Sequence, residues 1–325
     1  MRTSRIGRRL RRVAFALLLL VTGLCGSGAG AAERVVVDLD LGDDIDDAFA
    51  LALLVVSPEF DVVGVSTAWG DTPLRVRMTQ RFLHEYGRDD VPVAQGIVTP
   101  NATLFSQARW AECWPADGKP VPASVDLLLD AASGHPGTVT LLALGPLTNV
   151  AAALRRDPRR FRQFRRIVLM GGSVRRGYGR AQYAPPTPPA REYNVGADVT
   201  AAQAVFASGV PIVMFPLDAT LVQLDDVRRR ELFAHGSPRT DVLTLLYHQW
   251  SSADAPWAST IPTLFDVVPI AALIDSTLCP TVPLHIVVGD DGRTVETAGP
   301  ANAQVCLASD RQRVLDLMMR RLLLR

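Results

Sequence analysis

VVVDLDLGDDIDDAFALALL, residues 35–54, joins a strand-like apolar run to a helix-like segment through a cluster of acids. Six aspartates lie within ten residues, namely Asp38, Asp40, Asp43, Asp44, Asp46 and Asp47. Carboxylates this close repel one another and raise each other's pKa values, so the cluster is costly unless a positive charge lies among them. The stretch therefore predicts a cation site at the end of a strand.

The second half of this stretch has the period of an amphipathic helix. Apolar residues recur at spacings of three and four from Ile45 to Val56, and Pro58 follows, so we expect a helix over 45–57 with one buried stripe. Asp46 and Asp47 fall in its first turn, beside the partial positive charge of the helix N-terminus. Aspartates that cap a helix and stay solvated would explain one or two such acids, but not six.

Strand-like and helix-like segments alternate along the rest of the chain. Strand-like runs occur at 34–39, 60–67, 138–144, 166–170 and 210–215, and helix-like segments at 45–57, 72–86, 147–154, 198–208 and 225–233. This rhythm predicts a single Rossmann-related α/β domain, with a mostly parallel sheet and helices on both faces. The acids then lie at the carboxyl ends of strands, where such sheets bind ligands. The long non-periodic stretches 95–120 and 171–191 are expected to be lids or rims of the site.

The composition fits one large globular domain. The chain has 325 residues, of which 48% are hydrophobic and 21% charged, enough to bury a large core. The net charge is +1, from 34 Lys and Arg against 33 Asp and Glu, but six of the arginines lie in the first 12 residues. Without them the protein is acidic, which argues against a nucleic-acid partner.

Residues 1–31 have the features of a secretory signal peptide. The basic start is followed by an apolar run from Val13 to Leu24 and then by small residues up to Ala31. The run is too short to cross a bilayer. We therefore expect a cleaved signal, a domain at 32–325, no stable membrane insertion and a secreted or periplasmic location. The pair Arg11-Arg12 is compatible with a twin-arginine export route.

Three cysteines remain after removal of the signal: Cys113, Cys279 and Cys306. No CxxC or Cys/His spacing is present, so a zinc site is not expected. One alternative is a single disulfide formed in an oxidising compartment, with Cys279 and Cys306 the favoured pair. The other alternative is three buried free thiols.

The acidic cluster opens a series of motifs that resembles a known family. Asp-x-Asp after a strand, with further aspartates at a helix start, offers hard oxygen ligands of the kind that Ca²⁺ and Mg²⁺ prefer. The stretch resembles the N-terminal signature of the nucleoside hydrolases, in a longer variant. VSTAWGDT, LLALGPLTNVAAAL, IVLMGG, REYNVGADVTAA and LFDVVPIAAL follow in the family's order, from residue 34 to about residue 275.

The resemblance implies Ca²⁺-dependent hydrolysis of the N-glycosidic bond of ribonucleosides. In the family the ion binds two ribose hydroxyls and the attacking water. Carried over by motif, its ligands are Asp40, Asp47, Asp266 and the main-chain oxygen of Thr148, and Asp40 is also the general base. The substrate-binding candidates are Asp46, Asp71, Met170, Glu192, Asn194 and Phe265. The family also implies a homo-oligomer, either a dimer or a tetramer.

These residue types suit the reaction. Cleavage passes through a ribosyl cation of oxocarbenium character, which neighbouring carboxylates stabilise. Asp46 is expected to accept a hydrogen bond from a ribose hydroxyl, while Glu192 and Asn194 reach the far side of the sugar. Asp38 alternates to the other face of its strand, so we expect it to support the site from behind.

The sequence departs from the family pattern where the base is recognised. Phe265 replaces a histidine that helps to protonate a purine leaving group. Asp71 replaces an asparagine of the second loop and loses its amide donor. Prolines at 185 and 186 stand where an asparagine is common. The sugar and metal half of the predicted site is intact, whereas the base half is not.

Two other functions fit parts of the sequence. A non-catalytic ribose- or nucleoside-binding protein would keep the metal and lose the acid. A haloacid-dehalogenase-like phosphatase would explain VVVDLD and the VVGDDGR of residues 287–293, with Lys119, the sole lysine, in its active site. Smaller ambiguities concern His248, which either enters a site or lies at the surface or in the core, and Thr148 and Asn149, which could simply cap a helix.

Overall fold

The computed structural model describes residues 31–112, 114, 120–179, 187–254 and 259–324. The chain divides into two compact units, residues 1–32 and 33–325, and the fold described below is that of the second unit. Several sequence predictions fall outside the described residues: the signal peptide up to residue 30, Arg11-Arg12, Cys113, Lys119 and the prolines at 185 and 186.

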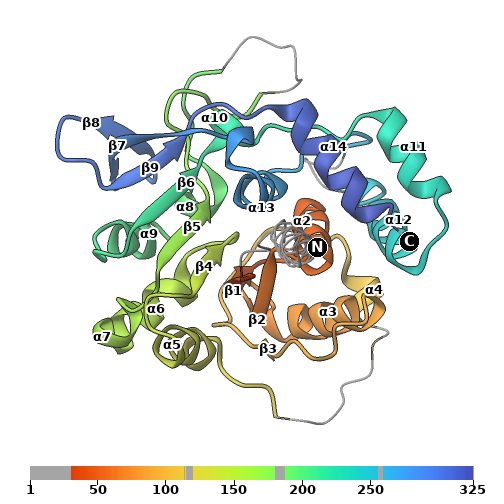
Figure 1. Cartoon of the computed structure of the whole chain (residues 1–325), viewed down its shortest axis with the longest axis horizontal. Helices are drawn as coiled ribbons and strands as arrows, with labels where there is room; N and C mark the ends of the chain where they lie inside the picture. Colours follow the sequence, from red (N-terminus) through yellow and green to blue (C-terminus); the bar gives the residue numbers. More distant parts are fainter. Residues whose placement is uncertain (1–30, 113, 115–119, 180–186, 255–258, 325) are drawn as a thin grey trace, which may run out of the picture. The chain divides into compact units, whose positions relative to one another are not determined.

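A nine-stranded sheet forms the centre of the domain, in the order β3-β2-β1-β4-β5-β6-β9-β7-β8 (Figure 1). Its strands are β1 (Glu33–Leu39), β2 (Phe60–Thr67), β3 (Val93–Ala94), β4 (Thr140–Ala143), β5 (Arg166–Met170), β6 (Ile212–Phe215), β7 (Thr281–Val288), β8 (Thr294–Thr297) and β9 (Ala303–Cys306). Neighbours from β3 to β9 are parallel, and β7 pairs antiparallel with β9 and β8. The predicted α/β fold with a mostly parallel sheet is confirmed.

Helices cover both faces of this sheet (Figure 1). The α-helices are α2 (Asp46–Val56), α3 (Thr72–Glu85), α4 (Ala108–Glu112), α5 (Ser124–Gly134), α6 (Thr148–Arg156), α7 (Pro158–Phe161), α8 (Tyr193–Ala197), α9 (Val199–Phe206), α10 (Leu217–Thr220), α11 (Asp226–Ala234), α12 (Pro238–Ser251), α13 (Val267–Ile274) and α14 (Arg311–Leu322). No described helix is long and apolar enough to span a membrane.

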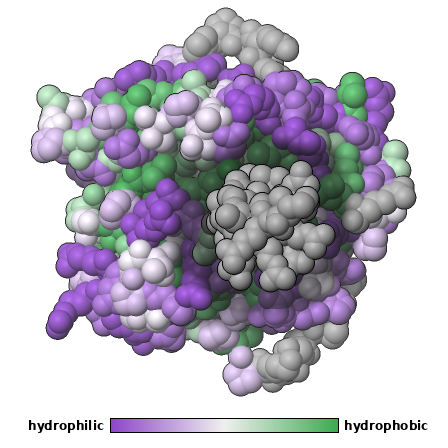
Figure 2. Space-filling model, viewed as in Figure 1, coloured by the Kyte–Doolittle hydropathy of each residue, from purple (hydrophilic) through white to green (hydrophobic). Residues whose placement is uncertain are grey.

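The hydrophobic core has two halves because successive strand residues point to opposite faces. Val35 and Val37 pack in one half with residues of α2, α3, α12, α13 and α14. Val36 packs in the other half with residues of α5, α6, α7 and α9. Hydrophilic side chains cover the outer surface at α7 and α14 (Figure 2).

Three features of the fold differ from the sequence prediction. The expected single buried stripe on the first helix is wrong: residues 46–54 are all buried, because α12, α13 and α14 cover the side of α2 that faces away from the sheet. The stretch 95–120 contains the short helix α4. The antiparallel strands β7 and β8 and the last three helices lie beyond the alternating pattern and were not predicted.

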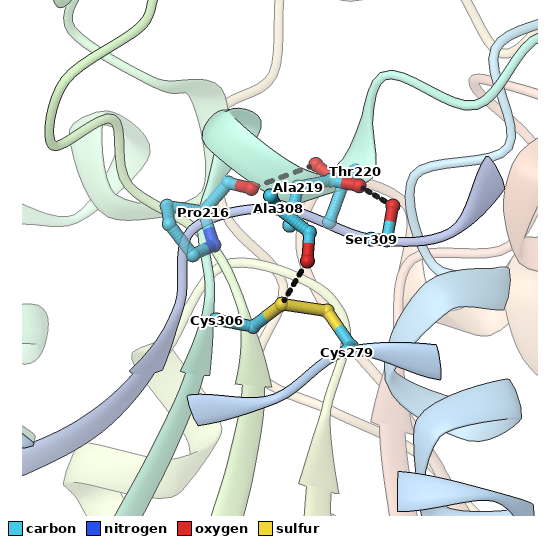
Figure 3. The surroundings of a disulfide bond; sticks show 7 residues. All are labelled: Pro216, Ala219, Thr220, Cys279, Cys306, Ala308 and Ser309. Atoms are coloured by element: carbon cyan, nitrogen blue, oxygen red, sulfur yellow. Dashed lines mark hydrogen bonds between the residues drawn. A yellow bond between two sulfur atoms is a disulfide. The ribbon is translucent and has the colours of Figure 1, made fainter. Parts of the chain in front are cut away.

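A disulfide links Cys279 to Cys306 (Figure 3). Cys279 follows the 3₁₀ helix η1 (Ser276–Leu278) and Cys306 ends β9, with the two Cα atoms 5.7 Å apart. Beside the bond, Ser309 Oγ donates to the carbonyl of Ala219 at 2.5 Å. The bridge therefore ties the segment that follows α13 to the sheet. Of the two alternatives for the cysteines, the structure contains the disulfide.

Reduction of this disulfide is expected to lower the free energy of unfolding by about 2–4 kcal/mol, because the bridge restricts the unfolded chain. Urea unfolding followed by tryptophan fluorescence, with and without dithiothreitol, measures the loss. The double variant Cys279→Ser/Cys306→Ser is the control, and its unfolding should not respond to the reductant. An equal response of the variant and the wild type would show that the bond does not stabilise the fold.

Candidate active site

Three carboxylates from two segments of the chain meet at one edge of the sheet. Asp46 and Asp47 open α2, and Asp266 immediately precedes α13, so two helix N-termini lie beside them. One oxygen from each of the three side chains lies within 4.8 Å of the other two, and all three residues are buried. Helix N-termini favour negative charge, but such close packing still leaves strong repulsion.

The electrostatics of the cluster follow from its burial. Burial, and next the repulsion from neighbouring carboxylates, hold the pKa values of Asp46, Asp47 and Asp266 well above the ordinary range. Burial also raises the pKa of Asp40 to about 7, against the opposing attraction of Arg75. A cation bound among these carboxylates would favour their ionised forms.

The unpaired oxygens of the cluster fit a divalent cation. Oδ1 of Asp47 and Oδ1 of Asp266 are buried and have no hydrogen-bond partner among the described residues. Unpaired buried oxygens are uncommon in native proteins and indicate an ion or a water, and carboxylates are the ligands that hard cations prefer. Asp46, which the sequence predicts to bind the ribose, is one of the three carboxylates that lie within 4.8 Å of one another. Asp40 lies beside that group and is not one of its three members.

Arg75 is a buried cation that the sequence analysis missed. Its Nη2 donates to Oδ2 of Asp43 at 2.8 Å, and its Nη1 donates to the carbonyl oxygens of Asp40 and, at 2.9 Å, Leu41. Its Nε donates to the carbonyl of Trp69 at 2.8 Å. A signal was present in the sequence: on a helix, Arg75 shares a face with apolar residues three and seven positions later.

Asp38 and Asn149 form a second buried network behind the cluster. Oδ1 of Asp38 accepts from Ser66 Oγ at 2.5 Å and from Asn149 Nδ2 at 2.9 Å. The same amide nitrogen donates to the Thr67 carbonyl, and Oδ1 of Asn149 accepts from the Ile97 amide, both at 2.9 Å. Asn149 is therefore a bridge between three segments rather than a helix cap. Asp38 is buried in this network, and its expected role in supporting the site stays a prediction.

Glu192, Asn194 and Met170 lie together above β4 and β5. Glu192 caps α8, and its carboxylate also accepts from the Gly172 amide at 2.8 Å. Nδ2 of Asn194 donates to the carbonyl oxygens of Leu144 and Met170, at 2.9 and 3.2 Å. These contacts fix the ends of both strands.

The remaining predicted site residues are more dispersed. Thr148 begins α6, and its hydroxyl donates to Asp198 at 2.7 Å. Asp71 is exposed and caps α3 by accepting from the Leu74 amide at 3.0 Å. His248 is exposed on α12 and packs on the ring of Phe233, with 5.5 Å between ring centroids, so it is a surface histidine.

Both long non-periodic stretches border the site. From residues 95–120, Nδ2 of Asn101 donates to Oδ2 of Asp43 at 3.1 Å. From residues 171–191, the ring of Tyr178 stands edge-on to Phe265, with centroids 6.2 Å apart. A pocket of about 310 Å³ lies between the first stretch and α8, lined by Trp69, Pro100, Asn101, Ala102, Arg191, Glu192, Tyr193, Gly196 and Ala197. It is large enough for part of a small organic ligand.

Comparison with known proteins decides the family. The model of the inosine-uridine preferring nucleoside hydrolases matches residues 35–316. The chain belongs to the nucleoside hydrolase family. This confirms the resemblance drawn from the motifs, and with it the assignment of the protein as an enzyme that hydrolyses the N-ribosyl bonds of ribonucleosides.

Individual relatives cover almost the whole domain. The pyrimidine-specific ribonucleoside hydrolase RihA of Citrobacter koseri is 32% identical in an alignment 319 positions long that covers 89% of this chain and 97% of the relative. A plant nucleoside hydrolase of known structure has a TM-score of 0.76 at 26% identity, over 90% of this chain and 99% of its own. The purine-preferring ribonucleoside hydrolase of Gardnerella vaginalis shares the fold, with a TM-score of 0.73 at 23% identity over 90% and 98%.

The structure also counts against the phosphatase alternative. VVGDDGR forms the end of β7 and the turn into β8. In the sheet order, β7 is separated from β1 by β4, β5, β6 and β9. The two motifs that resemble a phosphatase therefore do not meet at one site.

Asp47→Asn is expected to stabilise the metal-free protein, because it removes one charge from the repelling carboxylates. For a domain of this size, a relief of about 1 kcal/mol corresponds to a rise of roughly 1–2 °C in the thermal midpoint measured in chelator. The same variant should gain less stability than the wild type from added Ca²⁺. Asp61→Asn, at an exposed position, is the matched control and should change neither value. A lower midpoint for Asp47→Asn in chelator would contradict this account.

Proposed function

We propose that this nucleoside hydrolase depends on Ca²⁺, held by Asp40, Asp47, Asp266 and the main-chain oxygen of Thr148. The observation that carries the proposal is the buried carboxylate group with unpaired oxygens on Asp47 and Asp266. Because every donor is a hard oxygen, Ca²⁺ or Mg²⁺ suits the site better than a soft metal. The motif order of the family favours Ca²⁺.

The residues around this position account for the reaction. When bound, Ca²⁺ supplies positive charge that offsets the carboxylates and acidifies the attacking water. Asp40 accepts the proton of that water as general base. The water oxygen bonds to C1′ of the ribose while the bond from C1′ to the base nitrogen breaks. The base leaves with the bonding electrons and takes up a proton from solvent water after departure. The carboxylates stabilise the positive charge that develops on the sugar.

The ribose is bound by the surrounding side chains in this proposal. Asp46, at the start of α2, accepts a hydrogen bond from a ribose hydroxyl. Glu192 and Asn194, which hold the ends of β4 and β5, lie on the far side of the sugar. Asp71 caps α3, and its contact with substrate stays a prediction.

The leaving group is activated without a histidine at position 265. Phe265 is half-buried and contacts Tyr178 edge-on. An aromatic ring can stack on a base, but it has no proton to donate. We therefore propose that bases which leave without protonation are the preferred leaving groups.

We also propose that the protein acts outside the cytoplasm, in a secreted or periplasmic form. The basic and apolar character of residues 1–31 supports export. The Cys279–Cys306 disulfide suits an oxidising compartment.

Release of ribose from nucleosides is the direct test of the proposed function. Purified mature protein is incubated with inosine, uridine, cytidine and adenosine, and reducing sugar is measured before and after chelation. Activity should disappear in chelator and return with Ca²⁺. Nucleoside binding without ribose release would identify a binding protein instead. Activity that survives chelation would refute the dependence on Ca²⁺.

Asp40→Asn should reduce kcat by several powers of ten, because it removes the general base and a ligand charge together. Asp38→Asn removes only a carboxylate behind the site and should cost less, about 10–100-fold. Steady-state ribose release measures both. Equal losses of kcat in the two variants would show that Asp38 and Asp40 do not have different roles.

The wild type is expected to act weakly on inosine and faster on p-nitrophenyl riboside, whose leaving group departs without protonation. General acid catalysis typically contributes 10²–10⁴-fold in rate. Phe265→His should therefore raise the rate with inosine while the p-nitrophenyl rate stays nearly constant, so the activated substrate is the internal control. If the wild type cleaves inosine as fast as p-nitrophenyl riboside, another residue must supply the proton.

A further inference from the structure

Arg75 has no part in the chemistry proposed above, although it lies inside the acidic site. Its side chain is 1% exposed. A buried arginine is costly unless its N–H groups are bonded. Here they reach the carbonyl oxygens of Trp69, Asp40 and Leu41 and the carboxylate of Asp43. Three of the four acceptors are therefore main-chain oxygens, and neutralising a carboxylate accounts for only one of the contacts.

The main-chain contacts fix the turn that carries Asp40. β1 ends at Leu39, and the chain turns sharply at Gly42, where φ is +126°. Asp40 and Leu41 are buried, and a buried carbonyl left without a donor is destabilising. The Asp40 side chain is confined from another direction: a Cβ added to Gly145 would stand 2.7 Å from its Oδ1. Asp40 is thus held at its carbonyl by Arg75 and confined at its carboxylate by Gly145.

The contact with Asp43 also connects Arg75 to the neighbouring loop, which contains Asn101. Oδ2 of Asp43 accepts from Arg75 at 2.8 Å and from Nδ2 of Asn101 at 3.1 Å. The ring of Phe105 lies 4.9 Å from the guanidinium carbon. One cation therefore joins α3, the turn after β1 and the loop that lines the pocket.

We propose that Arg75 is a positioning residue for the hydrolysis, whose planar guanidinium holds the Asp40–Asp43 turn in its working shape before metal or substrate binds. The proposal rests on the proposed function and deepens it. Lysine cannot replace Arg75, because an ammonium group is a point charge without the fork that reaches several acceptors. The alternative is that Arg75 only neutralises Asp43.

Three variants separate the two roles. Arg75→Lys keeps the charge and loses the fork. The double variant Arg75→Met/Asp43→Asn removes the ion pair without leaving an unpaired charge. Arg81→Lys is the matched control, because Arg81 lies on the same helix but away from the acidic cluster. Its Nη1 donates to the carbonyl of Trp110 at 2.6 Å, and its guanidinium carbon lies 4.4 Å from the centroid of the Trp110 ring.

Each variant is measured in three ways: kcat and KM for the best nucleoside, the thermal midpoint in chelator, and Ca²⁺ affinity by calorimetry on chelator-treated protein. Arg75→Lys should lose about 10–100-fold in kcat and in Ca²⁺ affinity, the usual effect of removing a group that orients a metal ligand. Its KM should change little, because the proposed function gives Arg75 no contact with the ribose. Arg81→Lys should match the wild type in kcat and Ca²⁺ affinity.

The double variant decides between positioning and neutralisation. Positioning predicts a kcat as low as that of Arg75→Lys. It also predicts a thermal midpoint below the wild-type value, because methionine leaves the carbonyl oxygens of Trp69, Asp40 and Leu41 without their donor. Recovery of kcat in the double variant, or a wild-type kcat and Ca²⁺ affinity in Arg75→Lys, would overturn the proposal. If the wild type released no ribose, the proposed function would fail, and the Ca²⁺ titrations would still test the role of Arg75.

Discussion

Buried carboxylates that cannot all be ionised without positive charge among them are the constraint on which this structure depends. Asp40, Asp43, Asp46, Asp47 and Asp266 are each less than a tenth exposed. Asp43 obtains its positive partner from within the chain, since it pairs with Arg75 at 2.8 Å. Asp47 and Asp266 each keep an oxygen without a partner among the described residues. The fold thus supplies one cation, Arg75, and leaves oxygens of Asp47 and Asp266 free to bind a second one.

The rest of the domain holds this unfavourable arrangement together. α2 is buried along residues 46–54, and its apolar side chains pack against the sheet and against α13. The hydrophobic contacts of the two helices therefore oppose the repulsion between the carboxylates at their N-termini. The disulfide at Cys279 closes the segment that follows α13 onto β9. The hydrophobic core therefore stabilises a site whose carboxylates repel one another until a cation binds.

The local pattern of the sequence was enough to predict much of the site. Asp46 and Asp47 were expected in the first turn of a helix, and the helix begins at Asp46. The five predicted strands appear as β1, β2, β4, β5 and β6. Asp266 is 219 residues beyond Asp47 in the chain, so its place beside Asp47 came from the family resemblance and not from spacing.

Other features depend on contacts between segments that are distant in the chain. Arg75 shares a helix face with apolar residues, which indicates burial, but its neighbours Arg77 and Arg81 on the same helix give no indication of what it binds. Only the turn after β1, folded against α3, makes Arg75 a buried partner of Asp43. Asn149 resembled a helix cap in the sequence, yet its amide joins Asp38 to the ends of other segments. The burial of residues 46–54 of α2 likewise depends on helices near the C-terminus.

The unpaired oxygens of Asp47 and Asp266 are proposed to bind Ca²⁺, and a crystal structure of the mature protein at saturating Ca²⁺ is the decisive measurement. We expect one ion contacted by Asp40, Asp47, Asp266 and the carbonyl oxygen of Thr148, with ligand distances of about 2.3–2.6 Å. A position without an ion at saturating Ca²⁺, or an octahedral Mg²⁺ held by other residues, would refute this assignment.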